Sequence, residues 1–204
     1  MSVVVAILGG TDEKTFWALM DELGRRPGDR HERLEWLRGE LRARPAAESV
    51  EFQAHLEAAC EAVATDALWR AVRRIESGLC SDDGFDCFAL RLVAQGRGTY
   101  RAVLADPGAL ADVAEVRAPA GRHPREWCDD EWPEREELDY VAQEVFDELT
   151  GRGNDCLEAF HEALDTVQET WTKPEEAIRT AEATVRIGTP RPDALFPAET
   201  GPGT

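Results

Sequence analysis

The chain has 204 residues, 43% hydrophobic and 31% charged, which suits one globular domain and excludes a wholly disordered chain. Its 41 acidic residues outnumber 23 basic ones, giving a formal net charge of −18 at pH 7. Such a surface repels phosphate backbones and anionic lipid head groups, so we expect no direct nucleic-acid or membrane-surface binding. A basic protein, a cationic peptide or a metal ion would be attracted, and plain solubility is the simplest alternative role for the charge.

The chain carries no recognisable targeting or membrane-spanning segment. Residues 1–10 include an apolar run, but no basic residue precedes it and it is short for a signal-peptide core with a cleavage site. No stretch approaches the roughly 18 apolar residues of a membrane helix. We therefore expect a cytoplasmic location, where cysteines remain reduced thiols. None of the five cysteines belongs to a CxxC pair: Cys60, Cys80, Cys87, Cys128 and Cys156.

The first half of the chain predicts helices separated by glycine and proline breaks. Residues 1–10 are interpreted as an apolar leader or a lone strand. Apolar side chains at helical spacing then predict helices over 11–23, 29–43 and 46–76. A stretch of about 30 residues exceeds the usual globular helix, so we expect a break near Thr65, with Asp66 as the cap of the second half.

The second half also predicts helices, with one long ordered loop. Ser81 opens a helix that Gly96 ends, a short helix covers 99–105, and Pro107 begins a turn. Residues 117–133 form a loop that we expect to be ordered, because its two tryptophans would be costly to leave in water. Further helices are expected over 133–149, 155–171 and 174–187, followed by a flexible tail over 188–204.

These patterns together predict an all-α fold. No run alternates with period two, no internal repeat is present, and no glycine-rich phosphate loop follows a strand. We expect a single multi-helix domain of about seven to nine helices over residues 11–187.

The densest polar group is the aspartate cluster, Asp82, Asp83 and Asp86, which lies at the start of the helix that Ser81 opens. Helix capping by Ser81 and a favourable interaction of acids with the helix dipole explain one or two carboxylates. Three carboxylates repel one another, so some should face a cation or a partner. The alternatives are a buried network with arginines of the preceding helix, a metal or substrate site, and an acidic edge that faces a partner.

A second polar group lies in the loop and mixes soft and hard ligand types. A zinc or iron site there would use His123 and Cys128, with help from another segment. The alternative is a solvated acidic loop held in place by Trp127 and Trp132. Neither an HExxH motif nor a GxSxG motif is present, so the chain lacks these signatures of metal-dependent and serine hydrolysis.

A set of residues spread over the chain forms a pattern that is typical of a known family: Phe16-Trp17, Phe52-Gln53, Ser81 to Phe85, Phe88, Leu92, Gln95 to Arg97, Tyr100, Leu104, Asp106-Pro107, Tyr140 to Ala142 and Thr150-Gly151. With these residues the sequence resembles the bacterial, largely actinobacterial, family catalogued as domain of unknown function 4240. The resemblance covers roughly residues 11–151 and implies a helical fold without supplying an activity. Cys87 departs from it, since tyrosine is expected there, and the loop over 117–133 is longer and more acidic.

Three hypotheses for the function remain, and the sequence leaves the cofactor and the oligomeric state open. The first is an accessory or interaction protein that binds a basic protein or peptide through its acidic face and through the loop over 117–133, which we call the tryptophan loop. Its candidate binding residues are Arg97, Trp127, Trp132 and Tyr140. The second is an enzyme that uses the aspartate cluster and Arg91 for acid/base or metal-assisted chemistry, which a pocket beside Gly84 and a carboxylate of raised pKa would support. The third is a small-molecule or metal-binding module.

Overall fold

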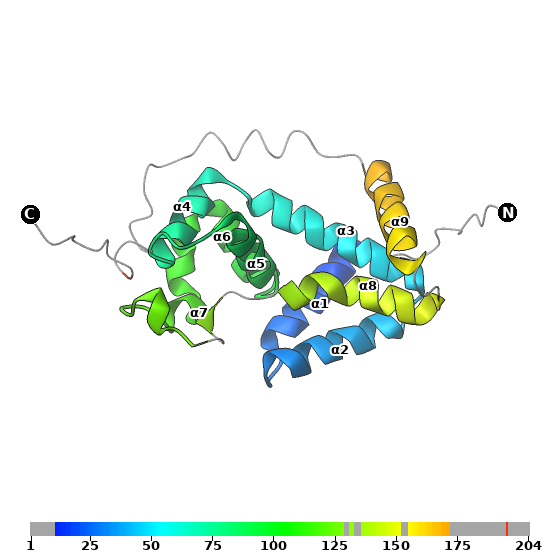
Figure 1. Ribbon diagram of the computed structural model, residues 1–204, viewed down its shortest axis with the longest axis horizontal. Helices are drawn as coiled ribbons and strands as arrows, with labels where there is room; N and C mark the ends of the chain where they lie inside the picture. Colours follow the sequence, from blue (N-terminus) through cyan, green and yellow to red (C-terminus); the bar gives the residue numbers. More distant parts are fainter. Residues whose placement is uncertain (1–10, 129–130, 133–135, 152–154, 172–194, 196–204) are drawn as a thin grey trace, which may run out of the picture.

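The computed structural model describes residues 11–128, 131–132, 136–151, 155–171 and 195. Over these residues the chain forms nine α-helices and two short 3-10 helices and contains no strand (Figure 1). The all-α fold expected from the sequence is therefore confirmed. The leader over 1–10 and the helix over 174–187 lie outside the described residues, as does the tail over 188–204 apart from Leu195.

The helices follow the breaks that the sequence predicts. Their bounds are α1 (Glu13–Arg25), α2 (Arg30–Arg42), α3 (Ala46–Val63), α4 (Asp66–Ile75), α5 (Asp82–Val93), α6 (Arg97–Ala105), η1 (Pro107–Asp112), α7 (Ala114–Arg117), η2 (Pro124–Glu126), α8 (Glu136–Thr150) and α9 (Cys156–Thr170). None of the helices in the described part of the chain has the length and apolar character needed to cross a membrane.

Short polar side chains set where the helices begin. The carboxylate of Asp12 accepts a hydrogen bond from the Thr15 amide at 2.7 Å and so caps α1. The break between α3 and α4 lies where it was expected, but the cap is Thr65 and not Asp66. Thr65 has the extended backbone of a cap residue, and its hydroxyl accepts from the Leu68 amide at 3.2 Å, whereas Asp66 is already helical.

Helix α3 lies at the centre of the packing. It contacts α1, α2, α5, α8 and α9, and its most extensive contact is with α8. Phe52 and Leu56 of α3 are fully buried, and Phe52 packs against Phe16 of α1 with ring centroids 5.3 Å apart. Figure 1 shows α2, α8 and α3 lying side by side, with α4 to α7 beyond the C-terminal end of α3.

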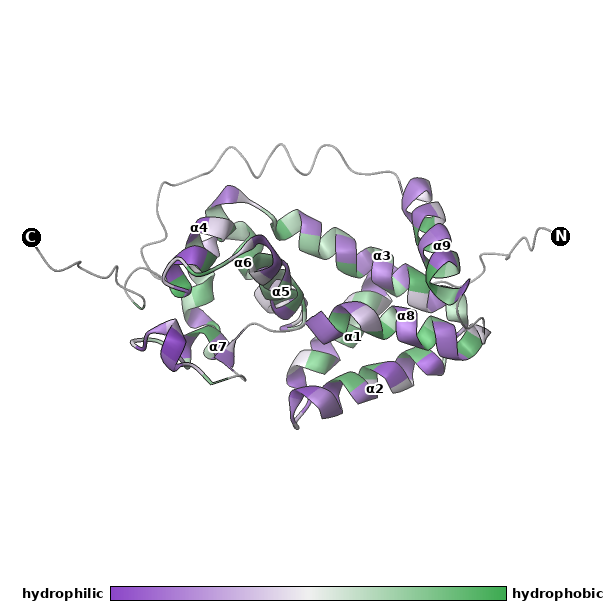
Figure 2. Ribbon diagram, viewed as in Figure 1, coloured by the Kyte–Doolittle hydropathy of each residue, from purple (hydrophilic) through white to green (hydrophobic). Residues whose placement is uncertain are grey.

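Polar contacts fix the position of α3 against its neighbours. The side-chain amide of Gln53 donates to Asp139 of α8 at 2.9 Å, and Glu57 accepts from Gln168 of α9 at 2.6 Å. Buried polar groups need such partners, so these bonds favour one register of the helices over others. Hydrophobic and hydrophilic patches alternate along each helix in Figure 2, as expected where one side packs and the other faces water.

A glycine joins α5 to α6 where α1 approaches closely. Gly96 has a φ of 89° and is buried, and the following amide, that of Arg97, donates to the Asp21 carboxylate of α1 at 2.7 Å. A Cβ atom on Gly96 would lie 2.6 Å from an oxygen of that carboxylate and 3.2 Å from the Asp21 Cα. Both the backbone conformation and the space therefore require glycine here.

We expect Gly96→Ala to lower the free energy of unfolding by about 2 kcal/mol, because it adds left-handed strain and a clash with Asp21. Gly98→Ala is the control. Gly98 lies two residues further on, in the first turn of α6, and no atom lies within 4 Å of a Cβ added there. Urea unfolding of both variants tests this. Equal stability of the two variants would contradict the close packing of α1 against the α5–α6 connection.

Candidate functional site

The aspartate cluster caps α5 and faces solvent. The Ser81 hydroxyl accepts from the Gly84 amide at 3.1 Å, and Asp82 and Asp83 occupy the first turn. All three carboxylates of the cluster are exposed, and none forms a hydrogen bond or ion pair with another described residue. The buried network with arginines of the preceding helix, one of the alternatives for this cluster, is therefore not formed over the described residues.

A pocket of about 370 Å³ opens beside Gly84, and we refer to it as the Glu76 pocket. It lies at the corner between α4 and α5, against the beginnings of α2 and α8 and the tryptophan loop. Its lining residues are Arg30, Glu76, Leu79, Ser81, Asp83, Gly84, Cys87, Trp132, Glu136 and Glu137. It therefore brings together two residues from separate predicted groups, Asp83 and Trp132.

Glu76 is the unusual group in this pocket. It is only 3% exposed, and its Oε1 atom has no hydrogen-bond partner among the described residues. Burial raises the pKa of the Glu76 carboxyl to about 7, although Cys80 and Arg91 act in the opposite direction. A carboxylate in this position lacks the compensation that a buried charge requires, so it is suited to receive a cation.

The sequence marks Glu76 by its helical spacing, although we did not predict it as a site residue. Leu68, Val72 and Glu76 are spaced four residues apart, so the acid continues the buried face of α4. An acidic residue on an apolar stripe is rare, because burying a charge is costly. In the sequence, Glu76 is the last residue of the helix predicted over 46–76 and is followed by Ser77 and Gly78.

Opposite charges and apolar surfaces share the walls of the Glu76 pocket. Arg30 supplies a cation from the first turn of α2, while Asp83, Glu136 and Glu137 supply acids. Leu79 and Trp132 supply apolar surface. The excess of carboxylates over cations favours a positively charged ligand with an apolar stem.

The two loop tryptophans pack on each other. Trp127 is 8% exposed, and its ring centroid lies 5.2 Å from that of Trp132. Trp132 lines the Glu76 pocket, whereas Trp127 supports it from within the core. Tyr140 is exposed on α8, and its hydroxyl donates to Glu136 at 3.0 Å, which places it next to the pocket rim.

The two arginines named from the sequence lie outside the pocket. Arg91 donates from Nε to Glu115 at 2.7 Å and from Nη1 to the carbonyl oxygen of Glu131 at 3.1 Å, so it fastens the tryptophan loop to α5. Arg97 pairs with Glu13 of α1 at 2.7 Å. Arg91 thus acts on the pocket through the loop that carries Trp132 and through its charge, which opposes the rise in the pKa of Glu76.

The residues named for a metal site lie in the same loop. The Nδ1 atom of His123 accepts a hydrogen bond from the Arg125 amide at 3.0 Å, and Cys128 is exposed. In the ranges that the structure describes, no group of three or more His, Cys, Asp or Glu side chains is arranged to hold a metal ion. Metal binding by His123 and Cys128 remains a prediction that would need a further ligand.

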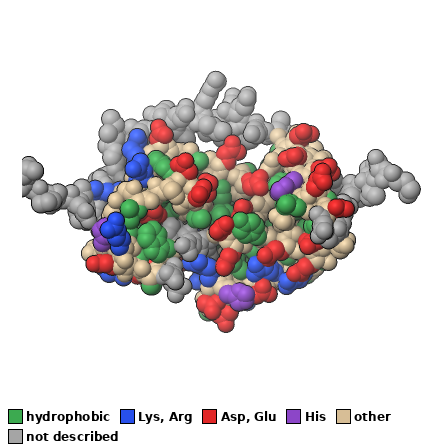
Figure 3. Space-filling model, viewed as in Figure 1, with side chains coloured by type: hydrophobic (Ala, Val, Ile, Leu, Met, Phe, Trp, Pro, Cys, Tyr) green, Lys and Arg blue, Asp and Glu red, His purple; other side chains and the backbone are tan. Residues whose placement is uncertain are grey.

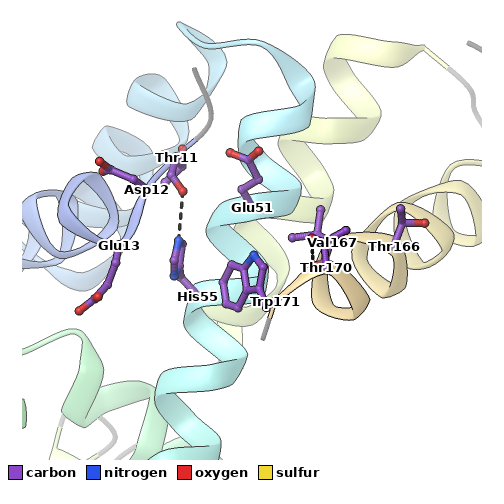
Figure 4. A pocket seen from close by; sticks show the side chains of 9 residues that line it. All are labelled: Thr11, Asp12, Glu13, Glu51, His55, Thr166, Val167, Thr170 and Trp171. Atoms are coloured by element: carbon purple, nitrogen blue, oxygen red, sulfur yellow. Dashed lines mark hydrogen bonds between the residues drawn. The ribbon is translucent and has the colours of Figure 1, made fainter. Parts of the chain in front are cut away.

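A second pocket, of about 390 Å³, lies between α1, α3 and α9, and we call it the α9 pocket. Figure 4 shows the segment from Thr11 to Glu13, where α1 begins, on one side and the α9 residues on the other, with Glu51, His55 and Trp171 between them. The Oε2 atom of Glu51 is buried without a partner among the described residues, and burial raises the pKa of this carboxyl. No sequence motif indicated this pocket, because its three walls come from helices distant in the chain.

His55 lines the α9 pocket and is held in one orientation. Its Nε2 atom lies 3.1 Å from the carbonyl oxygen of Thr11, so Nε2 must carry the proton. Its ring lies between Phe16 and Trp171, with ring centroids 5.5 Å and 4.4 Å away. Burial lowers the pKa of His55 below its usual value of 6.5, because the imidazolium form is poorly solvated there.

We expect Glu76→Gln to change how stability depends on pH. The folded-state pKa of Glu76 is about 7 and its ordinary value is 4.5, so the folded protein holds this proton more tightly. Glu76 therefore costs stability as pH rises from 4.5 to about 7, by on the order of 3 kcal/mol in total. Glutamine stays neutral, so the variant should gain stability relative to the parent protein over that interval.

Urea unfolding midpoints measured between pH 4.5 and pH 8 for both proteins test this expectation. Glu137→Gln is the control, since Glu137 lines the same pocket but is exposed. A constant stability difference between Glu76→Gln and the parent across this range would show that Glu76 is not a buried acid.

We expect Trp171→Ala to raise the pKa of His55 toward 6.5, because removal of the ring exposes the imidazole to water. NMR titration of the His55 ring protons measures the change. Leu157→Ala, at an exposed position of α9, should leave the His55 pKa unchanged. An unchanged pKa in Trp171→Ala would mean that α9 does not cover His55 in solution.

Comparison with known proteins identifies the family of the chain but supplies no activity for it. No curated protein and no solved structure matches the chain. The family model described as protein of unknown function (DUF4240) matches residues 11–148, which confirms the resemblance expected from the sequence. This range contains every residue that lines the Glu76 pocket, whereas α9 lies beyond it. The match spans more than half of the chain, so the protein belongs to the DUF4240 family of proteins of unknown function.

Proposed function

We propose that this protein is an accessory interaction protein that binds a basic segment of a partner protein, with the Glu76 pocket as the docking site. The observation that carries the proposal is that Glu76 lines a pocket while its Oε1 atom is buried without a partner among the described residues. A lysine ammonium or an arginine guanidinium would supply the missing hydrogen-bond donor and the compensating charge.

The surroundings of Glu76 support a cationic ligand. Trp132 offers an aromatic face, which attracts a cation when the two are close. Acidic side chains are scattered over the visible face of the molecule, where basic side chains are fewer (Figure 3). With a net charge of −18, this surface would speed the approach of a basic partner.

A cytoplasmic location forms part of the same proposal. All five cysteines are free thiols, and Cys128 is exposed. Free thiols persist in a reducing compartment, which supports this location.

A second candidate function is acid/base catalysis in the Glu76 pocket. A carboxyl with a pKa of about 7 beside Gly84 and Asp83 has the proton affinity that a general acid or base needs near neutral pH. Mass spectrometry of a basic peptide after long incubation with the protein separates the two functions. An unchanged peptide favours binding alone, whereas a product that Glu76→Gln fails to form favours catalysis.

We expect a short arginine-rich peptide, blocked at both termini, to bind the protein in isothermal titration calorimetry. Affinity should fall at least about tenfold as NaCl rises from about 50 to about 300 mM, because salt screens exposed charges. Glu76→Gln should weaken binding by about tenfold, since it removes the one charge that is paired out of water.

The control variant is Glu158→Gln, which makes the same charge change at an exposed position of α9. It should alter the affinity by less than about twofold, because it acts only through screened, long-range attraction. Equal effects of the two substitutions would remove the Glu76 pocket from the proposal. Absence of binding at low salt would contradict the proposed function itself.

A further inference from the structure

Two groups of opposite charge line the pocket: Arg30, which forms no ion pair or hydrogen bond with a described residue, and Glu76, whose buried Oε1 atom accepts no hydrogen bond from one. From these we infer that the Glu76 pocket binds the C-terminal residue of its partner, when that residue is arginine or lysine. The side-chain cation contacts Glu76 and the α-carboxylate contacts Arg30. This inference rests on the proposed function and adds to it the chemical class of the ligand.

Arg30 is available to an anion, and three of the acids near it accept hydrogen bonds from other groups. Asp29 and Glu32 form the capping box of α2, in which each side chain accepts a hydrogen bond from the backbone amide of the other, at 2.9 and 3.1 Å. Glu136, across the pocket, accepts from the Tyr140 hydroxyl at 3.0 Å. No described residue forms an ion pair or a hydrogen bond with the guanidinium of Arg30, which is half-buried in the pocket wall.

Glu76 is the complementary group at the other end of the ligand. Its exposed fraction is 3%, it lines the pocket, and its Oε1 atom has no partner among the described residues. Only a ligand that carries both a cation and an anion satisfies Glu76 and Arg30 together. A purely cationic ligand leaves Arg30 without a partner and places two positive charges in one pocket.

The size and the apolar surfaces of the pocket also fit one long basic residue. Its volume of about 370 Å³ lies in the range of small-ligand pockets, about 300–1,000 Å³. Leu79 and Trp132 offer apolar surface to the methylene stem that arginine and lysine share. The net charge of the pocket walls stays negative with Arg30 included, so the cationic end remains the stronger attraction.

A chain terminus satisfies the pocket better than the two related ligands. A basic residue inside a peptide presents only a neutral carbonyl to Arg30, which gives a weaker hydrogen bond than a carboxylate. A free basic amino acid carries an additional α-ammonium close to Arg30, which repels it. The terminal residue of a peptide has the carboxylate without the extra ammonium.

The experiment compares two forms of one peptide, N-acetyl-Gly-Gly-Arg with a free carboxylate and the same peptide as the C-terminal amide. NMR titration of the full chain, followed into the millimolar range, measures both affinities. We expect the carboxylate form to bind at least about tenfold more tightly, even though its net charge is less positive by one unit. Arg30→Gln should make the two forms bind equally, and Glu76→Gln should weaken both.

Arg70→Gln is the matched control, because it removes one positive charge from an exposed position of α4. It should leave the preference for the carboxylate form intact. Equal affinities for the two forms in the parent protein would overturn the inference while leaving the proposed function in place. Absence of binding by both forms, together with absence of binding by the longer blocked peptide, would overturn both.

Discussion

The fold depends on α3 being surrounded by other helices. Helix α3 packs against α1, α2, α5, α8 and α9, and its buried residues are distributed around its circumference, from Val50 and Phe52 to Ala59 and Val63. A helix packed on several sides needs partners for its polar groups inside the protein, and the Gln53 side-chain NH2 group and Glu57 find them on α8 and α9, whereas the Gln53 Oε1 atom has none among the described residues. These bonds fix the register of α8 and α9 against α3. Both pockets lie against helices that α3 holds in place, so the candidate sites depend on the same packing.

The charge of the protein has two physical roles. Most acids lie on the surface, where water solvates them and salt bridges such as that of Arg42 with Glu148 contribute little to stability. Glu76 differs, because burial removes the solvation that its charge needs, and Cys80 and Arg91 replace that solvation only in part, leaving the Oε1 atom without a described partner. The same burial therefore makes Glu76 a cost to stability at high pH and a site for a cation. Binding sites commonly contain a group that lowers the stability of the protein while no ligand is bound.

Arg91 connects the two parts of the Glu76 pocket that were predicted separately. It lies on α5, the helix that the aspartate cluster begins, and it contacts α7 through Glu115 and the loop that carries Trp132 through the backbone of Glu131. A residue that we named for its possible chemistry thus has a positioning role. Gln95 donates to the same Glu115 oxygen at 2.8 Å, so this carboxylate of α7 accepts hydrogen bonds from two side chains of α5 and its C-terminal end. The wall formed by Trp132 depends on that arrangement and not on the local sequence of the loop.

The sequence by itself determined the local structure. Helical spacing of apolar residues, the caps at Asp12 and Ser81, and the glycine at position 96 placed most helices close to their actual bounds, because these effects act within a few residues. The burial of Trp127 followed from its size in the same way. Tertiary structure alone decided which polar residues share a pocket. Arg30, Glu76 and Trp132 come from three distant segments, and neither the loss of solvation at Glu76 nor its proximity to Arg30 exists until those segments pack together.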